Sequence, residues 1–147
     1  MVTQIGRAAV FLAPEKPFEI REYEVPEPQP GAMVIKVGMA NICGSDLHAW
    51  HGRFQLGALG GKMPTVLGHE MTGSVVALGA GLTKDSDGRL LREGDRVVFT
   101  YFTSCGHCPG CLRGLRVTCS EATMAMTELA DAWPHFVGGF GDYYYVN

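Results

Sequence analysis

The sequence predicts a mainly β domain in which short strands form a barrel-like arrangement with only a few short helices. Three observations support this fold class. Glycine and proline contribute 20 and 8 of the 147 residues, a composition rich in turns. Several short apolar segments alternate between turn-forming stretches, and 46% of the residues are hydrophobic, which suffices for a core. The length is that of a single domain.

The expected strands are short and are separated by recognisable breaks. Alternation or a β-branched composition predicts strands at residues 5–12, 18–25, 33–40, 71–78, 96–101 and 143–146. A proline-rich turn at 26–31, a glycine-rich loop at 54–63 and a charged, turn-rich stretch at 79–95 separate them. Asp87-Gly88 is a hairpin signal within that stretch.

Helix is expected in two places only. Residues 44–52 read as one short helix that Ser45 or Asp46 caps and that Gly52 ends. Residues 124–133 are ambiguous and are expected to be partly helical. Trp133 in this segment is expected to pack in the core, with a place in a substrate pocket as the alternative for Trp133 and His135.

Charge and hydropathy exclude several classes of function. The net charge is −3, with 12 basic and 15 acidic side chains interspersed, so no nucleic-acid partner is expected. No apolar run of about 18 residues is present, so no membrane partner is expected either. Residues 1–7 lack the pattern of a signal peptide, and we therefore expect a cytoplasmic location.

Four of the five cysteines cluster within fifteen residues, a pattern typical of a metal site. Four thiolates suit tetrahedral Zn²⁺, and the two-residue spacers allow tight turns that aim successive sulfurs at one point. Because four protein ligands leave no position for a substrate, this zinc is expected to be structural. An iron–sulfur cluster and unliganded thiols are the alternatives, and His107 is expected to be an exposed loop histidine. The proposed ligands are Cys105, Cys108, Cys111 and Cys119.

The fifth cysteine, Cys43, belongs to a second and more dispersed group. It stands between a predicted strand and a predicted helix, where the helix dipole favours a thiolate, although a buried inert thiol is the usual alternative. His48 and His51 are three residues apart on that helix. His69 and Glu70 open the next strand, where alternation predicts opposite faces unless a bulge intervenes. One thiolate and one imidazole make half of an open zinc site.

Taken together, these motifs resemble the zinc-containing medium-chain alcohol dehydrogenase family. The resemblance covers almost the whole chain and follows the family's order and approximate spacing. The matching motifs, in addition to the four-cysteine loop, are Cys43-Gly44-Ser45-Asp46-Leu47-His48, Gly68-His69-Glu70, Gly94-Asp95-Arg96-Val97 and Gly139-Phe140-Gly141-Asp142-Tyr143.

The resemblance implies a GroES-like barrel, the family's catalytic domain, over residues 1–147. It implies that Cys43 and His69 hold a catalytic zinc and that Glu70 is a nearby carboxylate or an exchangeable ligand. Asp46 would orient the His69 ring, as zinc-bound imidazoles commonly require. The remaining protein ligand of the family normally comes from beyond Asn147.

The resemblance also implies a reaction. The substrate would be a small alcohol or carbonyl compound, and NAD or NADP would carry the hydride. Ser45 would pass the alcohol proton toward solvent, and His48 would continue this relay. Trp50 and Phe54 lie near the relay helix and would bound the substrate, with plain core packing as the alternative.

One part of the family pattern is missing from this chain. No Gly-x-Gly-x-x-Gly run occurs, so the nucleotide-binding domain of the family is absent from residues 1–147. We therefore expect a truncated fragment that is not competent alone, although the exposed face makes homo-oligomers plausible. We expect zinc on the four cysteines. The Cys43/His69 site is expected to be empty, partly occupied, or completed by Glu70 or water.

Two other functions remain as alternatives. The first is a stand-alone zinc-stabilised structural or binding module without turnover, which the missing nucleotide fingerprint favours. The combination of Cys43, Ser45, His48 and His69 favours the dehydrogenase, because a purely structural barrel has no need of that set. The second is a quinone-reductase relative without zinc, which would not need the four-cysteine loop.

Overall fold

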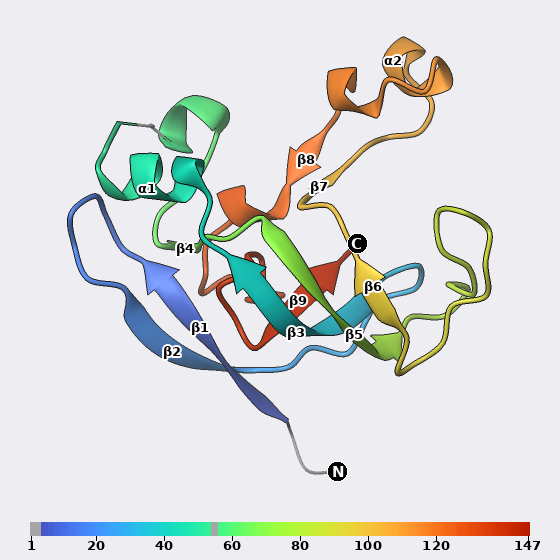
Figure 1. Ribbon diagram of the computed structural model, residues 1–147, viewed down its shortest axis with the longest axis horizontal. Coiled ribbons are helices and arrows are strands. Elements are labelled where there is room, and N and C mark those ends of the chain that lie inside the picture. Colours follow the sequence, from blue (N-terminus) through green and yellow to red (C-terminus); the bar gives the residue numbers. More distant parts are fainter. Residues whose placement is uncertain (1–3, 54–55) are drawn as a thin grey trace.

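The computed structural model describes residues 4–53 and 56–147 and contains two main antiparallel sheets (Figure 1). The smaller sheet has the strand order β2-β1-β4. Its strands are β1 (Ile5–Phe11), β2 (Glu19–Glu24) and β4 (Thr65–Val66). The strand β1 pairs with β2 over six residue pairs, from Ile5 opposite Glu24 to Val10 opposite Glu19.

The larger sheet has the order β6-β5-β3-β9, so the C-terminal strand lies at one edge. Its strands are β3 (Met33–Asn41), β5 (Glu70–Leu78), β6 (Arg96–Val98) and β9 (Tyr143–Val146). The register of β3 against β5 shifts twice, and such irregularities bend and twist a strand. Gly73 is required in β5, because a Cβ there would lie 2.2 Å from the carbonyl oxygen of Lys36.

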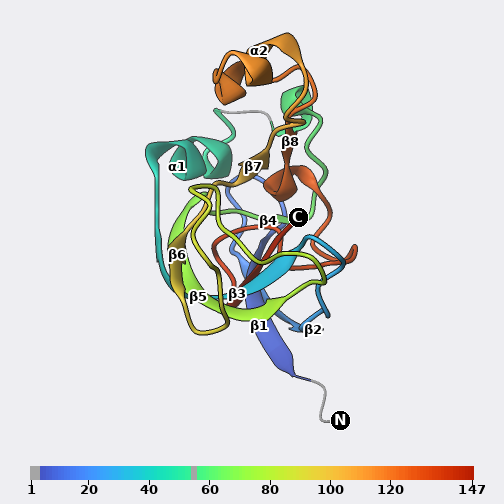
Figure 2. The ribbon, with the colours of Figure 1, turned by 90° about the vertical axis from the view of Figure 1, so that its right-hand side faces the viewer.

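The helical segments lie at the ends of the strands. The helix α1 (Gly44–Trp50) follows β3, and the 3-10 turns η1 (Leu56–Leu59) and η3 (Ala125–Thr127) lie in connections. Figures 1 and 2 show a lobe that extends away from both sheets, called the cysteine lobe below. It consists of residues 102–124, with β7 (Phe102–Thr103) paired to β8 (Thr123–Met124) at its base and α2 (Pro109–Leu112) and η2 (Arg116–Thr118) at its tip.

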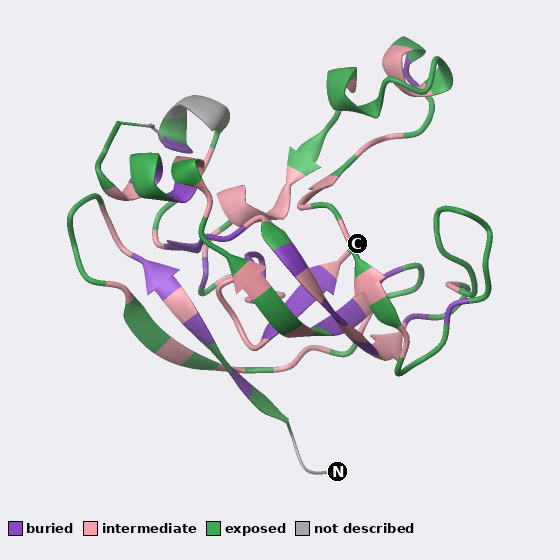
Figure 3. Cartoon of the chain, viewed as in Figure 1, coloured by how far each residue is buried: buried purple, intermediate pink, exposed green. Residues whose placement is uncertain are grey.

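The core lies between the sheets, where buried residues of β1, β5 and β9 gather (Figure 3). Phe136 is fully buried and packs edge-on against Tyr23 and Tyr143. Tyr143, Tyr144 and Tyr145 are all buried, so β9 has no solvent face along these residues despite its place at the sheet edge.

The mainly β fold expected from the sequence is confirmed, with differences in detail. The expected strand at 96–101 ends at Val98, and pairing resumes only at Phe102, in the cysteine lobe. The ambiguous segment 124–133 contributes one 3-10 turn. The core placement of Trp133 is wrong: 51% of this residue is exposed, and its ring packs edge-on against Tyr145. Asp85 and Lys84 hold the expected turn around Asp87-Gly88.

Across the described part of the chain, the structure contains no helix long and apolar enough to cross a membrane.

Candidate metal centres

Cys43 is placed by the junction of β3 and α1, where it is the N-cap residue of the helix in an extended conformation. The Oδ2 atom of Asp46 reaches back and accepts a hydrogen bond from the Cys43 backbone N–H at 2.9 Å. Asp46 therefore caps the helix, as one of the two expected residues, and it does so from the third helical position. The hydroxyl of Ser45, the other expected cap, lies against His69 instead. This carboxylate fixes the backbone that carries the Cys43 thiol.

His69 is brought to the same place by the glycine before it. Gly68 has a φ of +94°, and a Cβ there would lie 2.7 Å from Cδ1 of Phe140, so a side chain at this position would clash. The chain turns at Gly68, and β5 begins only at Glu70. Alternation therefore does not separate His69 from Glu70. The metal-ligating atoms of Cys43, His69 and Glu70 all lie within 4.8 Å of one another.

Both nitrogens of the His69 ring face polar groups. Nε2 lies 3.1 Å from the Ser45 hydroxyl oxygen, and Nδ1 lies 3.3 Å from Oδ1 of Asp46. The Nδ1–Oδ1 pair is close but poorly aligned for a hydrogen bond, so both buried atoms are left without a partner. An imidazole whose second nitrogen faces a carboxylate is the arrangement that orients a metal-bound histidine. The thiol, the ring and the unpartnered atoms together fit a metal site.

A cavity of about 150 Å³ opens beside this group. Ser45, Asp46 and His69 form its polar end, and its remaining wall is mostly apolar. The ring of Tyr101 packs edge-on against the His69 ring at a centroid distance of 5.2 Å. The apolar wall includes Leu56, Leu67, Met124 and Met126. No sequence motif predicted that Tyr101 and Met126 line this cavity, because the two residues come from separate connections between strands.

Other residues considered from the sequence lie away from this cavity. His48 is exposed on α1, and His51 is the C-cap residue after it. Trp50 is half-buried, and its Nε1 donates to the Lys16 carbonyl oxygen at 3.0 Å. Phe54 lies outside the described residues. His135 stacks on Tyr23 instead of lining the cavity, with ring centroids 4.7 Å apart.

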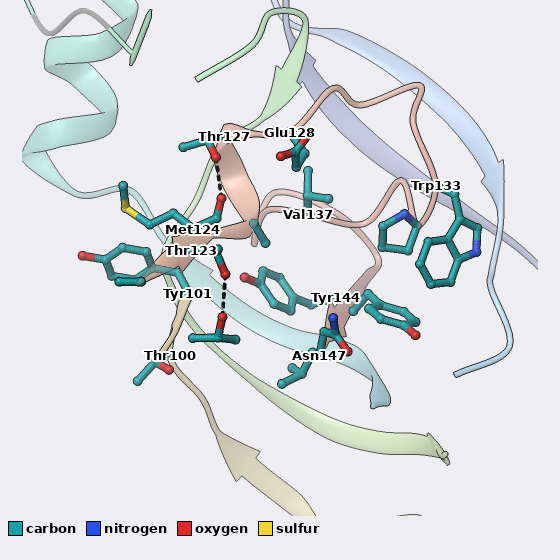
Figure 4. Close-up of a pocket in the computed structure, with 16 residues that line it drawn as sticks. Thr100, Tyr101, Thr123, Met124, Thr127, Glu128, Trp133, Val137, Tyr144 and Asn147 are labelled. Carbon is teal, nitrogen blue, oxygen red and sulfur yellow. Dashed lines mark hydrogen bonds between the residues drawn. The ribbon is translucent and has the colours of Figure 1, made fainter. Parts of the chain in front are cut away.

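Trp133 lines a different and larger cavity of about 380 Å³ (Figure 4). Tyr144 and Asn147 contribute to the same wall. Tyr101 lines both cavities, so the larger space is next to the smaller one. Trp133 therefore lines a cavity, as its alternative expectation has it, but not the cavity that His69 lines.

The four clustered cysteines converge in the cysteine lobe, with their sulfurs all within 4.8 Å of one another. The Sγ atom of Cys105 lies 3.6 Å from that of Cys119 and 4.0 Å from that of Cys111. Backbone N–H groups point at the sulfurs: Cys105 and Glu121 donate to Cys119, and Cys108 donates to Cys105. N–H donors directed at sulfur favour thiolates, the form that binds metal.

Hydrogen bonds from backbone N–H groups also lower the pKa of the Cys108 thiol. Backbone N–H groups of Cys111 and Ser120 lower the pKa of Cys108 to about 6, whereas at Cys105 the lowering by the His107 backbone is outweighed, and burial and neighbouring thiols raise the pKa to about 11. The Cys108 thiolate is therefore favoured at neutral pH, as a metal ligand requires. The donor set and the converging sulfurs fit a four-coordinate metal ion of the kind that closed structural sites hold.

Comparison with known proteins identifies the family of this chain. The family model described as "Alcohol dehydrogenase GroES-like domain" matches residues 29–147. The chain belongs to this family. The match covers most of this GroES-like domain, including both groups of metal-ligating residues. The expected GroES-like fold is thereby confirmed.

Relatives of this GroES-like domain include alcohol dehydrogenases. An alcohol dehydrogenase of Geobacillus stearothermophilus is 30% identical over 138 residues, which are 93% of this chain and 38% of the relative. The crystal structure of an alcohol dehydrogenase from Thermotoga maritima matches with a TM-score of 0.85 at 25% identity, over 98% of this chain and 39% of that one.

A further solved structure, an alcohol dehydrogenase from Escherichia coli CFT073 complexed with NADH, matches with a TM-score of 0.73 at 32% identity. The match covers 97% of this chain and 36% of that chain. The GroES-like domain therefore spans little more than a third of the length of the relatives it matches.

Proposed function

We propose that residues 1–147 are the catalytic domain of a zinc-dependent, NAD(P)-linked oxidoreductase that interconverts small alcohols and carbonyl compounds. The observation that carries the proposal is the convergence of the metal-ligating atoms of Cys43, His69 and Glu70, of which His69 also lines a cavity. A thiolate, an imidazole and a carboxylate are ligands that a catalytic zinc accepts, and fewer than four firm protein ligands leave a position for a substrate oxygen.

Each residue near the candidate centre has a distinct role in this proposal. Cys43 and His69 hold the zinc, and Glu70 is an exchangeable carboxylate beside them. When bound, zinc polarises a substrate oxygen and lowers the pKa of an alcohol. Asp46 is a positioning residue, because one of its oxygens holds the Cys43 backbone and the other faces the His69 ring.

The proton released from an alcohol needs a path out of the cavity. Ser45 lines the cavity, and its hydroxyl can accept one proton while it donates another. His48 is exposed and lies three residues further along α1, a spacing that puts the two residues on the same face of the helix. We propose that Ser45 takes the proton and that His48 passes it to solvent.

The shape of the cavity supports a small substrate. About 150 Å³ with a largely apolar wall and one polar end suits a short alcohol or carbonyl compound. The E. coli relative is a complex with NADH and is much longer than this chain. We propose that the nicotinamide reaches the cavity from a part of the protein outside residues 1–147, and that residues 1–147 alone do not turn over.

The four cysteines have a separate role in the proposal. Zinc on Cys105, Cys108, Cys111 and Cys119 would be structural, since four sulfurs complete a tetrahedral shell. The cysteine lobe has only one buried residue in its central part, Cys108, so apolar packing contributes little to its order. Metal binding would supply the free energy that orders the lobe.

Cobalt substitution tests the proposal. Chelated, reduced protein would be titrated with Co²⁺, whose thiolate charge-transfer and ligand-field bands report each site. We expect Cys43→Ala and His69→Ala each to remove the same cobalt site, and Cys119→Ser to disrupt a different one. Addition of a short alcohol should shift the ligand-field band only of the site that Cys43→Ala removes.

The outcome separates the two functions that the sequence left open. A stand-alone module stabilised by zinc needs only metal in the cysteine lobe, so it predicts no cobalt site that depends on Cys43 or His69 and no response to alcohol. Cobalt spectra that Cys43→Ala and His69→Ala both leave unchanged would overturn the dehydrogenase proposal.

A further inference from the structure

The cysteine lobe carries a second convergence of metal-ligating atoms, which involves two residues outside the four-cysteine group. The sulfur of Cys105, a ring nitrogen of His107 and a carboxylate oxygen of Glu121 all lie within 4.8 Å of one another. Cys105 thus belongs to two sets of three or more ligands. One set is made of sulfur alone, and the other offers sulfur, nitrogen and oxygen.

Local hydrogen bonds hold His107 in this arrangement. Gly106 has a φ of +79°, a left-handed turn that folds His107 back over Cys105. Nδ1 of His107 lies 2.9 Å from the Cys105 carbonyl oxygen, which only accepts hydrogen bonds, so Nδ1 carries the proton. Nε2 is then the ring nitrogen that is left to face a metal ion.

Nε2 of His107 faces a carboxylate. Nε2 lies 3.4 Å from Oε1 of Glu121, and the Glu121 backbone is itself held by its N–H bond to the Cys119 sulfur at 3.4 Å. A ring nitrogen of His107 and a carboxylate oxygen of Glu121 thus lie close together, and the Cys105 sulfur lies within 4.8 Å of the same group of ligand atoms.

Charge and exposure favour a cation there. Four thiolates around one divalent ion leave a net negative charge, and Glu121 adds another negative charge beside it. The side chains of His107 and Glu121 are 72% and 59% exposed, so an ion between them would keep water in its remaining positions. Such an ion would exchange more readily than one enclosed by four sulfurs.

We propose that Cys105, His107 and Glu121 bind a second, exchangeable divalent cation of the zinc class, and that the Cys105 thiolate bridges it to the ion of the four-cysteine site. A mixed sulfur, nitrogen and oxygen donor set suits zinc and not magnesium or calcium, which prefer oxygen. The site lies outside the proposed catalytic centre, and its only premise is that the four cysteines bind metal.

Cadmium NMR tests the site on the whole chain. Chelated, reduced protein would be titrated with an enriched spin-half cadmium isotope, which replaces zinc and gives one resonance per site. We expect two resonances from the lobe at saturation, and the second should appear only after the first site is occupied. Because one sulfur bridges the two ions, these resonances should show mutual scalar coupling through Cys105.

Variants locate the second lobe resonance. His107→Ala and Glu121→Gln should each abolish it and leave the first resonance in place with its coupling lost. A double variant, His51→Ala with Glu93→Gln, removes the same two residue types at exposed positions elsewhere and should keep both. Cys43→Ala should remove only the resonance of the proposed catalytic centre, so failure there is separable from failure in the lobe.

Three results would overturn the proposal. They are a single lobe resonance at saturating cadmium, a second resonance that survives both His107→Ala and Glu121→Gln, and two lobe resonances without mutual coupling. In the first case the His107–Glu121 contact would be an ordinary ion pair of a protonated histidine.

Discussion

Oδ1 of Asp46 lies 3.3 Å from Nδ1 of His69, and both atoms are buried without a hydrogen-bond partner. The other oxygen of the same carboxylate holds the Cys43 backbone at 2.9 Å. One side chain therefore links the two elements that carry the candidate ligands, α1 and the turn before β5. This relationship makes the candidate centre sensitive to a change that leaves its ligands untouched.

Asp46→Asn should weaken metal binding at the Cys43/His69 site. The amide keeps an oxygen for the Cys43 N–H but removes the negative charge that faces His69, so we expect about 10–100-fold weaker binding. Chelator competition that resolves the two sites would measure this effect. Asp95→Asn is the matched control, because Asp95 also accepts a backbone N–H bond, from Arg92, far from the site. Equal affinity in both variants would contradict the positioning role.

Gly68→Ala should both destabilise the domain and displace His69. A residue with a Cβ costs about 1–2 kcal/mol in this left-handed backbone conformation, and the new Cβ would also clash with the Phe140 ring and backbone. Gly81→Ala separates the two effects, since Gly81 has a similar φ but open space around it. Urea unfolding should show a larger loss for Gly68→Ala than for Gly81→Ala, and equal losses would show that the Phe140 contact is unimportant.

Phe136→Ala should be the most destabilising of these substitutions. Phe136 is fully buried and packs edge-on against Tyr23 and Tyr143, so its truncation should cost about 3–5 kcal/mol in the free energy of unfolding. Leu90 is 65% exposed, and Leu90→Ala should change stability by no more than about 0.5 kcal/mol. Urea unfolding with tryptophan fluorescence measures both. If Phe136→Ala lowered the free energy of unfolding by no more than Leu90→Ala does, the packing described for Phe136 would be contradicted.

Cys119→Ser should release the cysteine lobe while the sheets stay folded. The Cys119 sulfur accepts N–H bonds from Cys105 and Glu121 as well as supplying a proposed zinc ligand. We expect amide protection to fall to nearly unfolded levels in residues 102–124 and to persist in β3 and β5, by hydrogen exchange. Ser120→Ala, at the exposed neighbouring position, should retain protection. Persistent protection of the lobe in Cys119→Ser would exclude metal as its source of order.

Asp131 gives a pH-dependent contribution to stability. Hydrogen bonds from Tyr23 and Arg21 hold the pKa of Asp131 below its ordinary value. A carboxyl group with a lowered folded-state pKa stabilises the fold above its unfolded pKa, about 3.9, and loses this contribution as the pH falls through the folded value. Asp131→Asn should therefore be less stable than the parent at neutral pH, and the difference should close in acid.

Urea unfolding at several pH values measures that difference. Tyr23→Phe, which removes the hydroxyl donor and keeps the ring, should reduce the neutral-pH contribution of Asp131 without abolishing it, because Arg21 remains. A stability difference between Asp131→Asn and the parent that is the same in acid and at neutral pH would contradict this account.

Local patterns in the sequence predicted the class of fold and the grouping of the four cysteines. Turn-forming residues and alternation act over a few neighbours, so strands such as β1, β2 and β5 lie close to their expected ranges. The two-residue spacers between Cys105, Cys108 and Cys111 constrain the sulfurs through the same short range of chain. The GroES-like family likewise followed from motifs that are contiguous in sequence.

Tertiary structure decided what depends on residues far apart in the chain. The turn at Gly68 beside Phe140 brings the ligating atoms of His69 and Glu70 within 4.8 Å of each other, and strand alternation does not apply to His69 because β5 begins only at Glu70. Tyr101 reached the cavity from a loop, and Glu121 reached His107 across the lobe. Trp133 stayed exposed although its apolar surface favours burial. Such contacts depend on how distant elements pack, and no local pattern of residue types encodes that packing.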